Sequence, residues 1–367
     1  MKITLVDAIP FLIPFSSELS MKLTNRVSMA AQHVLIRIQT DAGIEGIGEA
    51  PARPQIYGET QKSIVAAVEG HLGPAIVGKD PFDLEKVHAA MNNLFGNLTT
   101  KGAIDIALHD IMGKQTNLPV HKLLGSWSGQ KIPLSWMVGI KETDEMAQEC
   151  NKYKKMGFNA FKIKVGIEPS KDVENFKAVR EAVGKDAILY VDANQGYSPH
   201  AARWVIQQME KYGLAWIEEP CPVWNHKERL KLAQSISVPI LGDESCSTLQ
   251  DVAREIELGA VGMVSIKVAR TGFYESRKII HLCEQAGIPC LIGSQGDSGI
   301  GAAAGAHFAT SFRNVQYPAE ISYHLRMKGD LLIDPVKISQ GFIEIPSGHG
   351  LGIHLDEQKI KEFRLYN

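Results

Sequence analysis

The feature that most constrains the fold is a series of short apolar runs, each closed by a charged residue at a nearly constant interval. The intervals between these charged residues are 28, 26, 25 and 24 residues. Short buried strands that alternate with amphipathic helices at such spacing are typical of parallel β/α units. The charged residues that close the runs are Lys164, Asp192, Glu218, Asp243 and Lys267.

Eight runs of this kind follow one another in the second part of the chain, and they predict eight strands. They lie at 134–138, 160–165, 188–191, 214–217, 240–241, 262–266, 289–292 and 315–318. A closed barrel of eight parallel strands needs about 250 residues, so a chain of 367 residues has room for the barrel and a smaller domain. The stretch after Glu320 lacks a clear helix, which makes the last crossover incomplete.

The first third of the chain has a different, α+β pattern. Strands are indicated at 1–11, 33–40 and 44–50, and helices at 60–72, 84–91 and 103–114. We therefore expect an α/β fold: a (β/α)7β modified TIM barrel over residues 126–325, with an α+β capping domain over residues 1–125. Alternating strands in residues 326–367 indicate that the C-terminal segment returns to the capping domain.

Carboxylates close three consecutive predicted strands, at Asp192, Glu218 and Asp243. In a barrel the carboxyl ends of the strands meet at one mouth, so these side chains converge. Such an all-oxygen set suits a hard, octahedral cation, with Mg²⁺ as the first choice and Mn²⁺ as the alternative. No His or Cys ends the same strands, which disfavours zinc.

Lysines stand on both sides of these carboxylates. Lys162 and Lys164 are two residues apart, so on a strand they point to the same face. Their mutual repulsion and a nearby cation would lower one pKa from ~10.4 towards the ~7 to 8 of a working base. We assign Lys164, nearer the mouth, as that base, and Lys162 as a permanent cation that holds the substrate carboxylate. Lys267 reaches the opposite face, so one lysine can remove a proton and the other can deliver one.

The strand-end motifs FKIKVG, VDAN, IEEP, GDES and SIKVARTGF, together with IPFLIP, EAPARPQIYGET and AIDIALHDIMGK in the first domain, resemble those of the enolase superfamily, muconate lactonizing enzyme subgroup. The combination of lysines and magnesium is that superfamily's known chemistry. The resemblance implies that Asp192, Glu218 and Asp243 bind the metal and that Lys164 and Lys267 are the acid and base. It also implies a homo-oligomer, a position for Asn194 near the metal, and capping loops at 24–26 and 53–57 that close over the substrate.

Two enzyme activities fit this pattern, both of which form an enediolate next to a substrate carboxylate. The first is muconate cycloisomerase, which converts cis,cis-muconate to muconolactone. The second is a racemase or epimerase of an N-modified or cyclic amino acid, of the N-acyl amino acid or proline/betaine type. A catalytically silent metal-binding barrel is disfavoured because all three carboxylates and both lysines are present.

The choice between these activities depends on side chains around the mouth. An acidic pair at Asp297 and Glu320 would favour an amine, whereas a neutral or basic pocket would favour a dicarboxylate. The segment AEISYHL after the last strand has no Asp-x-Asp, which argues against a dipeptide epimerase. The residues expected to contact the substrate are Arg53, Tyr57, Asn194, Gln295, Asp297 and Glu320.

Several of these features also have a purely structural explanation. A single buried charge at a strand end could belong to a structural ion pair, but six together are costly to bury without a function. Glu219 and Glu244 lie one residue beyond two predicted ligands, so we expect them to be mainly structural. The sequence Gly-Asp-Ser-Gly at 296–299 is interpreted as a tight loop and not as a serine nucleophile.

Composition excludes several classes of partner. With 39 basic and 41 acidic residues the net charge is −2, and no long run of one sign suggests a nucleic-acid groove or a membrane surface. A small, anionic or zwitterionic partner remains, and the resemblance implies a small carboxylate substrate. The five cysteines are odd in number and lack CxxC spacing, and Pro10 and Pro14 interrupt the apolar N-terminus. These features indicate reduced thiols and a cytoplasmic protein.

Overall fold

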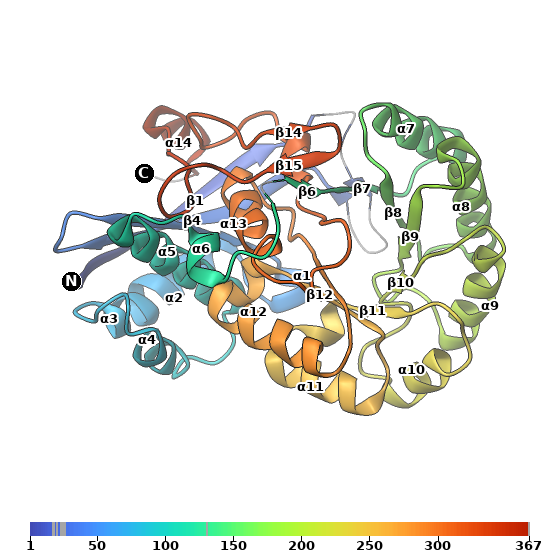
Figure 1. Ribbon diagram of the computed structural model, residues 1–367, viewed down its shortest axis with the longest axis horizontal. Helices are drawn as coiled ribbons and strands as arrows, with labels where there is room; N and C mark the ends of the chain where they lie inside the picture. The colour runs from blue at the N-terminus through green and yellow to red at the C-terminus, as the bar shows by residue number, and fades with distance from the viewer. Residues whose placement is uncertain (17–18, 20, 23–26, 130, 366–367) are drawn as a thin grey trace.

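The computed structural model describes residues 1–16, 19, 21–22, 27–129 and 131–365 (Figure 1). The predicted capping loop at 24–26 therefore lies outside the described residues, as does part of the segment that precedes it. Within the described part, β2 (Met21–Lys22) pairs antiparallel with β3 (Val27–Ser28). No described helix is long and apolar enough to cross a membrane.

The first domain is built on an antiparallel sheet with the strand order β1–β4–β5. Its strands are β1 (Ile3–Pro14), β4 (Ala30–Thr40) and β5 (Glu45–Pro51). The helices are α1 (Pro54–Tyr57), α2 (Gln61–Ala67) followed by a π-helical turn (Val68–Leu72), α3 (Gly73–Ile76), α4 (Leu84–Met91) and α5 (Leu98–Thr116). We refer to this sheet with helices α1–α5 as the cap.

Helix α5 lies directly on strand β5 because that strand has glycines where the two backbones meet. A Cβ atom at Gly46 would come within 2.1 Å of the carbonyl oxygen of Ala107, and one at Gly48 within 2.0 Å of that of Ala103. Any larger side chain would push the helix away. Most of α5 is consequently buried between the sheet of the cap and the rest of the molecule.

Seven parallel strands follow, in the order β13–β12–β11–β10–β9–β8–β7. They are β7 (Ser135–Val138), β8 (Ala160–Lys164), β9 (Ile188–Asp192), β10 (Ile217–Glu218), β11 (Ile240–Gly242), β12 (Met263–Ile266) and β13 (Cys290–Ile292). The helices that cover their outer face are α7 (Thr143–Lys155), α8 (Pro169–Val183), α9 (Pro199–Glu210), α10 (His226–Ala233), α11 (Leu249–Leu258), α12 (Val268–Gln285) and α13 (Gly299–Ala309) (Figure 1).

An eighth extended segment closes the curled sheet. Val315 forms a parallel bridge with Cys290 of β13, and Ala319 forms one with Leu134, next to β7. The amide of Ser135 also donates to the carbonyl of Ala319 at 2.8 Å. A 3-10 turn (Tyr323–Arg326) follows in place of a helix. The expected α/β fold, a (β/α)7β barrel with an α+β cap, is confirmed.

The last part of the chain contacts both halves of the molecule. Helix α6 (Val120–Leu124) and strand β6 (Lys131–Pro133) lead into the barrel, and the hairpin β14 (Ile338–Ser339) and β15 (Phe342–Glu344) pairs with β6. Helix α14 (Glu357–Phe363) then packs on β1, and Arg364 forms an antiparallel bridge with Phe11.

The interior of the barrel has two layers. One layer is apolar and aromatic and contains Tyr190, Trp216, Leu241, Met263 and Leu291. The charged residues at the strand ends form the other layer.

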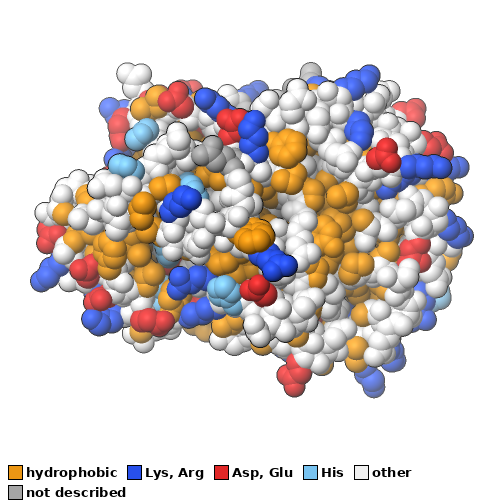
Figure 2. All heavy atoms as spheres, in the orientation of Figure 1, with side chains coloured by type: hydrophobic (Ala, Val, Ile, Leu, Met, Phe, Trp, Pro, Cys, Tyr) orange, Lys and Arg blue, Asp and Glu red, His pale blue; other side chains and the backbone are white. Residues whose placement is uncertain are grey.

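The five cysteines are all buried, and none forms a disulfide. On the face shown in Figure 2, Lys and Arg side chains are interspersed with Asp and Glu, without a large area of one sign.

Candidate active site

The sheet register brings the predicted residues together at the mouth of the barrel. Lys164 pairs laterally with Asp192, and Asp192 with Glu218, so these three side chains project from adjacent strands at one level. Asp243 follows β11 directly, and Lys267 follows β12. All five side chains are buried. The spacing in the sequence therefore located a real cluster.

Lys162 lies at the centre of this cluster, among carboxylates. Its Nζ atom is 2.6 Å from Glu218 Oε2, 3.0 Å from Glu320 Oε2 and 3.2 Å from Asp192 Oδ2. Burial alone would lower the pKa of Lys162, but these carboxylates hold it well above its usual range. This geometry fits the expected permanent cation. Because three carboxylates of the protein surround Lys162, it is not well placed for its other expected role, which is to hold the substrate carboxylate.

The two proposed acid/base lysines lie on different sides of the cluster. Lys164 Nζ donates to Asp192 Oδ2 at 2.5 Å and to Asn194 Oδ1 at 2.9 Å. Lys267 donates to Asp243 Oδ2, and although burial opposes it, this carboxylate raises the pKa of Lys267. Strands β9, β10 and β11 separate β8 from β12, so a small molecule at the mouth would lie between the two ammonium groups.

The carboxylates fit a hard cation in the type and arrangement of their donors. Glu218 Oε1 is buried without a hydrogen-bond partner, and burial together with the neighbouring Asp192 raises the pKa of Glu218 well above its usual range. Such an oxygen is satisfied by a bound cation. Among the described residues no three His, Cys, Asp or Glu side chains already converge on one point. Lysine ammonium groups lie between the carboxylates. The donors that would bind Mg²⁺ are Asp192, Glu218 and Asp243.

Glu219 holds the backbone next to these carboxylates, and the only sign of it in the sequence is the acidic doublet Glu218-Glu219. Its Oε1 accepts from the amides of Asp243 and Ser245 at 2.7 and 2.8 Å, and from Ser245 Oγ at 2.6 Å. Its Oε2 accepts from Arg229 at 2.7 Å. The expectation that Glu219 is structural agrees with these contacts, which fix the backbone of Asp243.

Glu244 faces a different neighbour. Its Oε1 accepts from Asn194 Nδ2 at 3.2 Å, and Asn194 in turn accepts from Lys164. Burial, Asp243 and Glu219 raise the pKa of Glu244 to about 8. Asn194, one of the predicted substrate contacts, thus connects the proposed base to the next carboxylate.

The cap reaches the mouth through the predicted segment 53–57. Gln295 Nε2 donates to the hydroxyl oxygen of Tyr57 at 2.5 Å, and Arg270 Nη1 lies 3.3 Å from the same oxygen. Arg53 donates to the carbonyl oxygen of Gln295. Arg270, which sequence reasoning missed, also donates to Asp243 Oδ1 at 3.0 Å. Three predicted substrate contacts therefore meet next to a predicted metal ligand.

The two remaining predicted contacts, Asp297 and Glu320, do not form an acidic pair. Asp297 Oδ2 accepts from Ser294 Oγ at 2.6 Å within its own loop, and burial together with the nearby Glu49 raises the pKa of Asp297. Glu320 lies inside the barrel, where it binds Lys162 and accepts from the hydroxyl of Tyr190 at 2.8 Å.

Glu49 of the cap was also missed, because its partners lie far away in the sequence. Its carboxylate accepts from the amide of Ser298 at 2.9 Å, from Ser298 Oγ at 2.7 Å and from the amide of Gly301 at 2.8 Å. These groups form the N-terminus of α13. His33 binds the same carboxylate from the other side. The cap thus holds the loop that carries Gln295 and Asp297.

Comparison with known proteins places this arrangement in a family. Residues 145–359 match the family model described as enolase C-terminal domain-like, and residues 14–125 match the mandelate racemase/muconate lactonizing enzyme N-terminal domain. The chain belongs to the enolase superfamily. Members of this superfamily generally depend on a divalent cation such as Mg²⁺, in agreement with the donors at the mouth.

The relatives of this enolase-superfamily chain include two kinds of isomerase. The crystal structure of a muconate lactonizing enzyme from Mycobacterium smegmatis, in complex with muconolactone, is 37% identical over 100% of both chains, with a TM-score of 0.97. The N-succinyl-L-Arg/Lys racemase of Bacillus cereus is 31% identical over 100% of this chain and 99% of its own length. A hydrophobic dipeptide epimerase of Enterococcus faecalis is 34% identical over 82% of this chain and 86% of its own. The chain is therefore an isomerase.

Proposed function

We propose that this isomerase is a muconate cycloisomerase that converts cis,cis-muconate to muconolactone. The observation that carries the proposal is the position of Lys164 and Lys267 on opposite sides of one carboxylate cluster. The full-length likeness to a muconate lactonizing enzyme supports the choice of substrate. So do the engaged acidic groups, because Glu320 is bound to Lys162 and Asp297 to its own loop.

The reaction needs one new C–O bond and one proton. An oxygen of the C1 carboxylate of muconate adds to C4 and closes a five-membered lactone. The electron pair of the C4=C5 double bond moves to C5, the carbon alpha to the C6 carboxylate, which gives an enediolate. That carbon then takes one proton, and we assign Lys267 as the donor, since its ammonium form is favoured by Asp243.

The rest of the site stabilises and encloses the enediolate. When bound, the divalent cation supplies positive charge next to the developing negative charge. Lys162 supplies a fixed positive charge beneath the carboxylates, which limits their mutual repulsion. Tyr57 and Arg53 of the cap contact Gln295 and close the mouth from above, where they exclude water and select the substrate.

The proposal is tested by NMR of the protein with Mg²⁺ and cis,cis-muconate in deuterated water. The expected result is muconolactone with one deuterium at the alpha carbon, formed only without EDTA and lost in Lys267→Ala. The stereochemistry of that deuterium identifies the face from which the proton comes. Lack of turnover by the wild-type protein with Mg²⁺ present would rule out muconate as the substrate.

A second candidate is racemisation or epimerisation of an N-modified or cyclic amino acid, and the full-length similarity to an N-succinyl-L-Arg/Lys racemase favours its N-acyl form. In that reaction one lysine removes the alpha proton and the other returns a proton to the opposite face. The same sample format tests it with both enantiomers of N-succinyl-arginine. Exchange of the alpha proton with deuterium, together with loss of optical rotation, would favour this activity over the cycloisomerase.

A further inference from the structure

Helix α12, which begins directly after Lys267, is interrupted within its first turns. Gly272 has φ 61° and ψ −172°, so the chain leaves the helical conformation there and resumes it at Phe273. The amide groups of a helix's first turn have no acceptor within the helix. At Phe273 and Tyr274 the acceptor comes from the cap, because both amides donate to Asp105 Oδ2 of α5, at 2.6 and 3.1 Å.

Asp105 is itself held rigidly. Its side chain is completely buried, and its Oδ1 lies 2.7 Å from His88 Nε2. His109, one turn along α5, donates from Nδ1 to the backbone carbonyl of Asp105 at 2.9 Å. Burial alone would raise the pKa of Asp105, but the two histidines hold it well below its usual range. A charged, fixed acceptor is therefore presented to the barrel.

Close backbone contact brings α5 against the turn that carries Lys267. A Cβ atom at Gly102 of α5 would lie 2.9 Å from the carbonyl oxygen of Ala269, and one at Gly272 would lie 2.5 Å from Asp105 Oδ2. The turn is tied to Lys267 at its other end, since the amides of Arg270 and Thr271 donate to the Lys267 carbonyl at 2.8 and 3.2 Å. Residues 267–271 thus form a short connection between the active site and Asp105.

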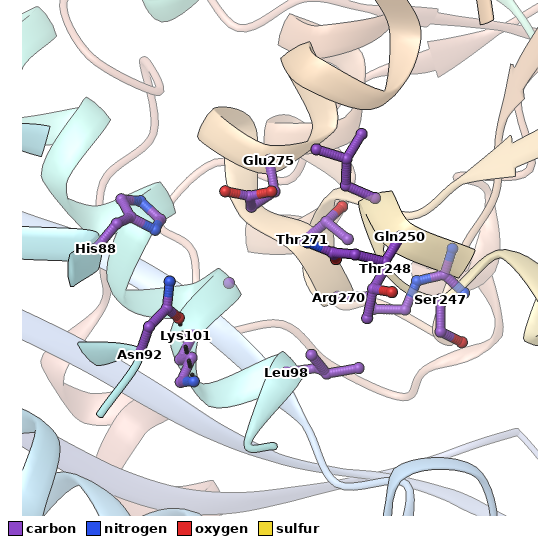
Figure 3. Close-up of a pocket in the computed structure, with 12 residues that line it drawn as sticks. His88, Asn92, Leu98, Lys101, Ser247, Thr248, Gln250, Arg270, Thr271 and Glu275 are labelled. Atoms are coloured by element: carbon purple, nitrogen blue, oxygen red, sulfur yellow. Dashed lines mark hydrogen bonds between the residues drawn. The ribbon is translucent and has the colours of Figure 1, made fainter. Parts of the chain in front are cut away.

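The surrounding interface is not filled. A cavity of about 280 Å³ lies between the cap and the barrel beside this contact (Figure 3). In Figure 3, His88 and Lys101 come from the cap side and Thr271 and Glu275 from α12. The cavity separates the cap from the barrel on this side of the turn, whereas next to Asp105 the ring of His88 stacks on Tyr274 and that of His109 contacts Phe273.

We propose that Asp105 is a positioning residue, through which the cap sets the place of Lys267 at the mouth of the barrel. This inference rests on the proposed role of Lys267 in proton transfer. The proposed role explains why an aspartate stands near the start of the AIDIALHD segment. A small displacement of an acid or base is enough to slow proton transfer greatly.

The test compares Asp105→Asn with Asp110→Asn in the full-length protein. Asp110 is on the same helix and equally buried, but it accepts from the amides of Ile47 and Leu351, at 3.1 and 2.8 Å, away from the Lys267 turn. The first readout is hydrogen exchange of a peptide spanning residues 263–275, followed by mass spectrometry, which does not depend on activity. Faster exchange in Asp105→Asn, but not in Asp110→Asn, is expected.

The second readout is the kinetics of muconate turnover with Mg²⁺. Asp105→Asn is expected to lower kcat about tenfold to a hundredfold with KM nearly unchanged, while Asp110→Asn keeps kcat per folded enzyme. Unchanged exchange of the 263–275 peptide, or faster exchange with unchanged kcat, overturns the inference. If the wild-type protein does not turn over muconate, only the proposed substrate is wrong. The difference in hydrogen exchange of the 263–275 peptide between the two variants still decides whether Asp105 fixes the turn.

Discussion

Arg229 donates a hydrogen bond of 2.7 Å to Glu219, and both side chains are completely buried. Glu219 has φ 35°, in the left-handed region that favours glycine, so its conformation is strained. The contacts of its carboxylate with the amides of Asp243 and Ser245 hold it there. The pair therefore fixes the backbone between two predicted metal ligands, Glu218 and Asp243.

Replacement of Arg229 by Met is expected to destabilise the protein strongly. The change leaves Glu219 as a buried charge without its ionic partner, which costs about 3–5 kcal/mol in comparable cases. Urea denaturation, followed by circular dichroism, measures the loss. Lys231→Met is the control, because its ion pair with Glu228 is on the surface and its removal should leave the midpoint unchanged. Equal midpoints for both variants would show that the buried pair is dispensable.

Addition of Mg²⁺ is expected to raise the melting temperature, and EDTA to reverse the effect. The orphan oxygen of Glu218 gains a partner when a cation binds, and a ligand at 100 times its Kd stabilises the folded state by about 2.7 kcal/mol. Glu218→Gln should abolish the increase, whereas Glu257→Gln, on the exposed surface of α11, should keep it. Differential scanning fluorimetry over a range of Mg²⁺ concentrations makes the comparison. A response that survives in Glu218→Gln would place the cation elsewhere.

Stability is expected to fall as the pH decreases from 6.5 towards 4 because of His307. Its Nδ1 accepts from the amide of His121 at 3.3 Å, its Nε2 lies 3.0 Å from the carbonyl oxygen of Leu351, and burial lowers its pKa from 6.5 to about 4. The folded state then binds fewer protons than the unfolded state within this window, so protonation favours unfolding. The loss approaches about 3 kcal/mol at the lower end.

Urea midpoints between pH 8 and pH 4 test the role of His307. In His307→Gln the slope of stability against pH should be smaller than in the wild-type protein, although the variant is less stable at pH 8. The exposed His200 supplies the matched control, since His200→Gln should leave the slope unchanged. If all three proteins show the same slope, the acid sensitivity comes from other groups.

Tyr57→Phe is expected to raise KM several-fold and to leave kcat nearly unchanged. The hydroxyl of Tyr57 connects Gln295 to Arg270, and loss of a hydrogen bond worth about 1 kcal/mol corresponds to a factor of about five. Steady-state kinetics with the substrate identified by NMR provide the measurement. Tyr212→Phe, at the opposite end of the barrel, should behave like the wild-type protein. A fall in kcat at constant KM would instead place Tyr57 in the chemical step.

The barrel and its central cluster could be predicted from the sequence because both follow a local rule. Each strand is a short apolar run, and the residue that ends it must face the mouth, so Lys164, Asp192 and Glu218 could be identified from spacing alone. The orientation of Glu320 could not be predicted in this way. It also ends an extended segment, but whether its carboxylate faces a substrate or Lys162 depends on the neighbouring strands.

The roles of the cap residues that act on the barrel could not be predicted from the sequence for a related reason. Glu49 and Asp105 each accept amide hydrogens from helices about 170 to 250 residues away in the chain, and nothing next to them in the sequence indicates which amides these are. Gly102 and Gly272 permit the contact, but no local pattern indicates that their backbones lie against the other domain. Such relationships depend on how the two domains dock.

The bridge between Arg364 and Phe11 joins a segment that is synthesised after the barrel to a strand that is synthesised before it. Strand β1 is an edge strand of the cap, and α14 with Arg364 covers part of that edge. Since α14 follows the barrel in the chain, this part of the edge of β1 stays unpaired until the barrel has been synthesised. The cap is therefore completed by a segment that is made after the barrel.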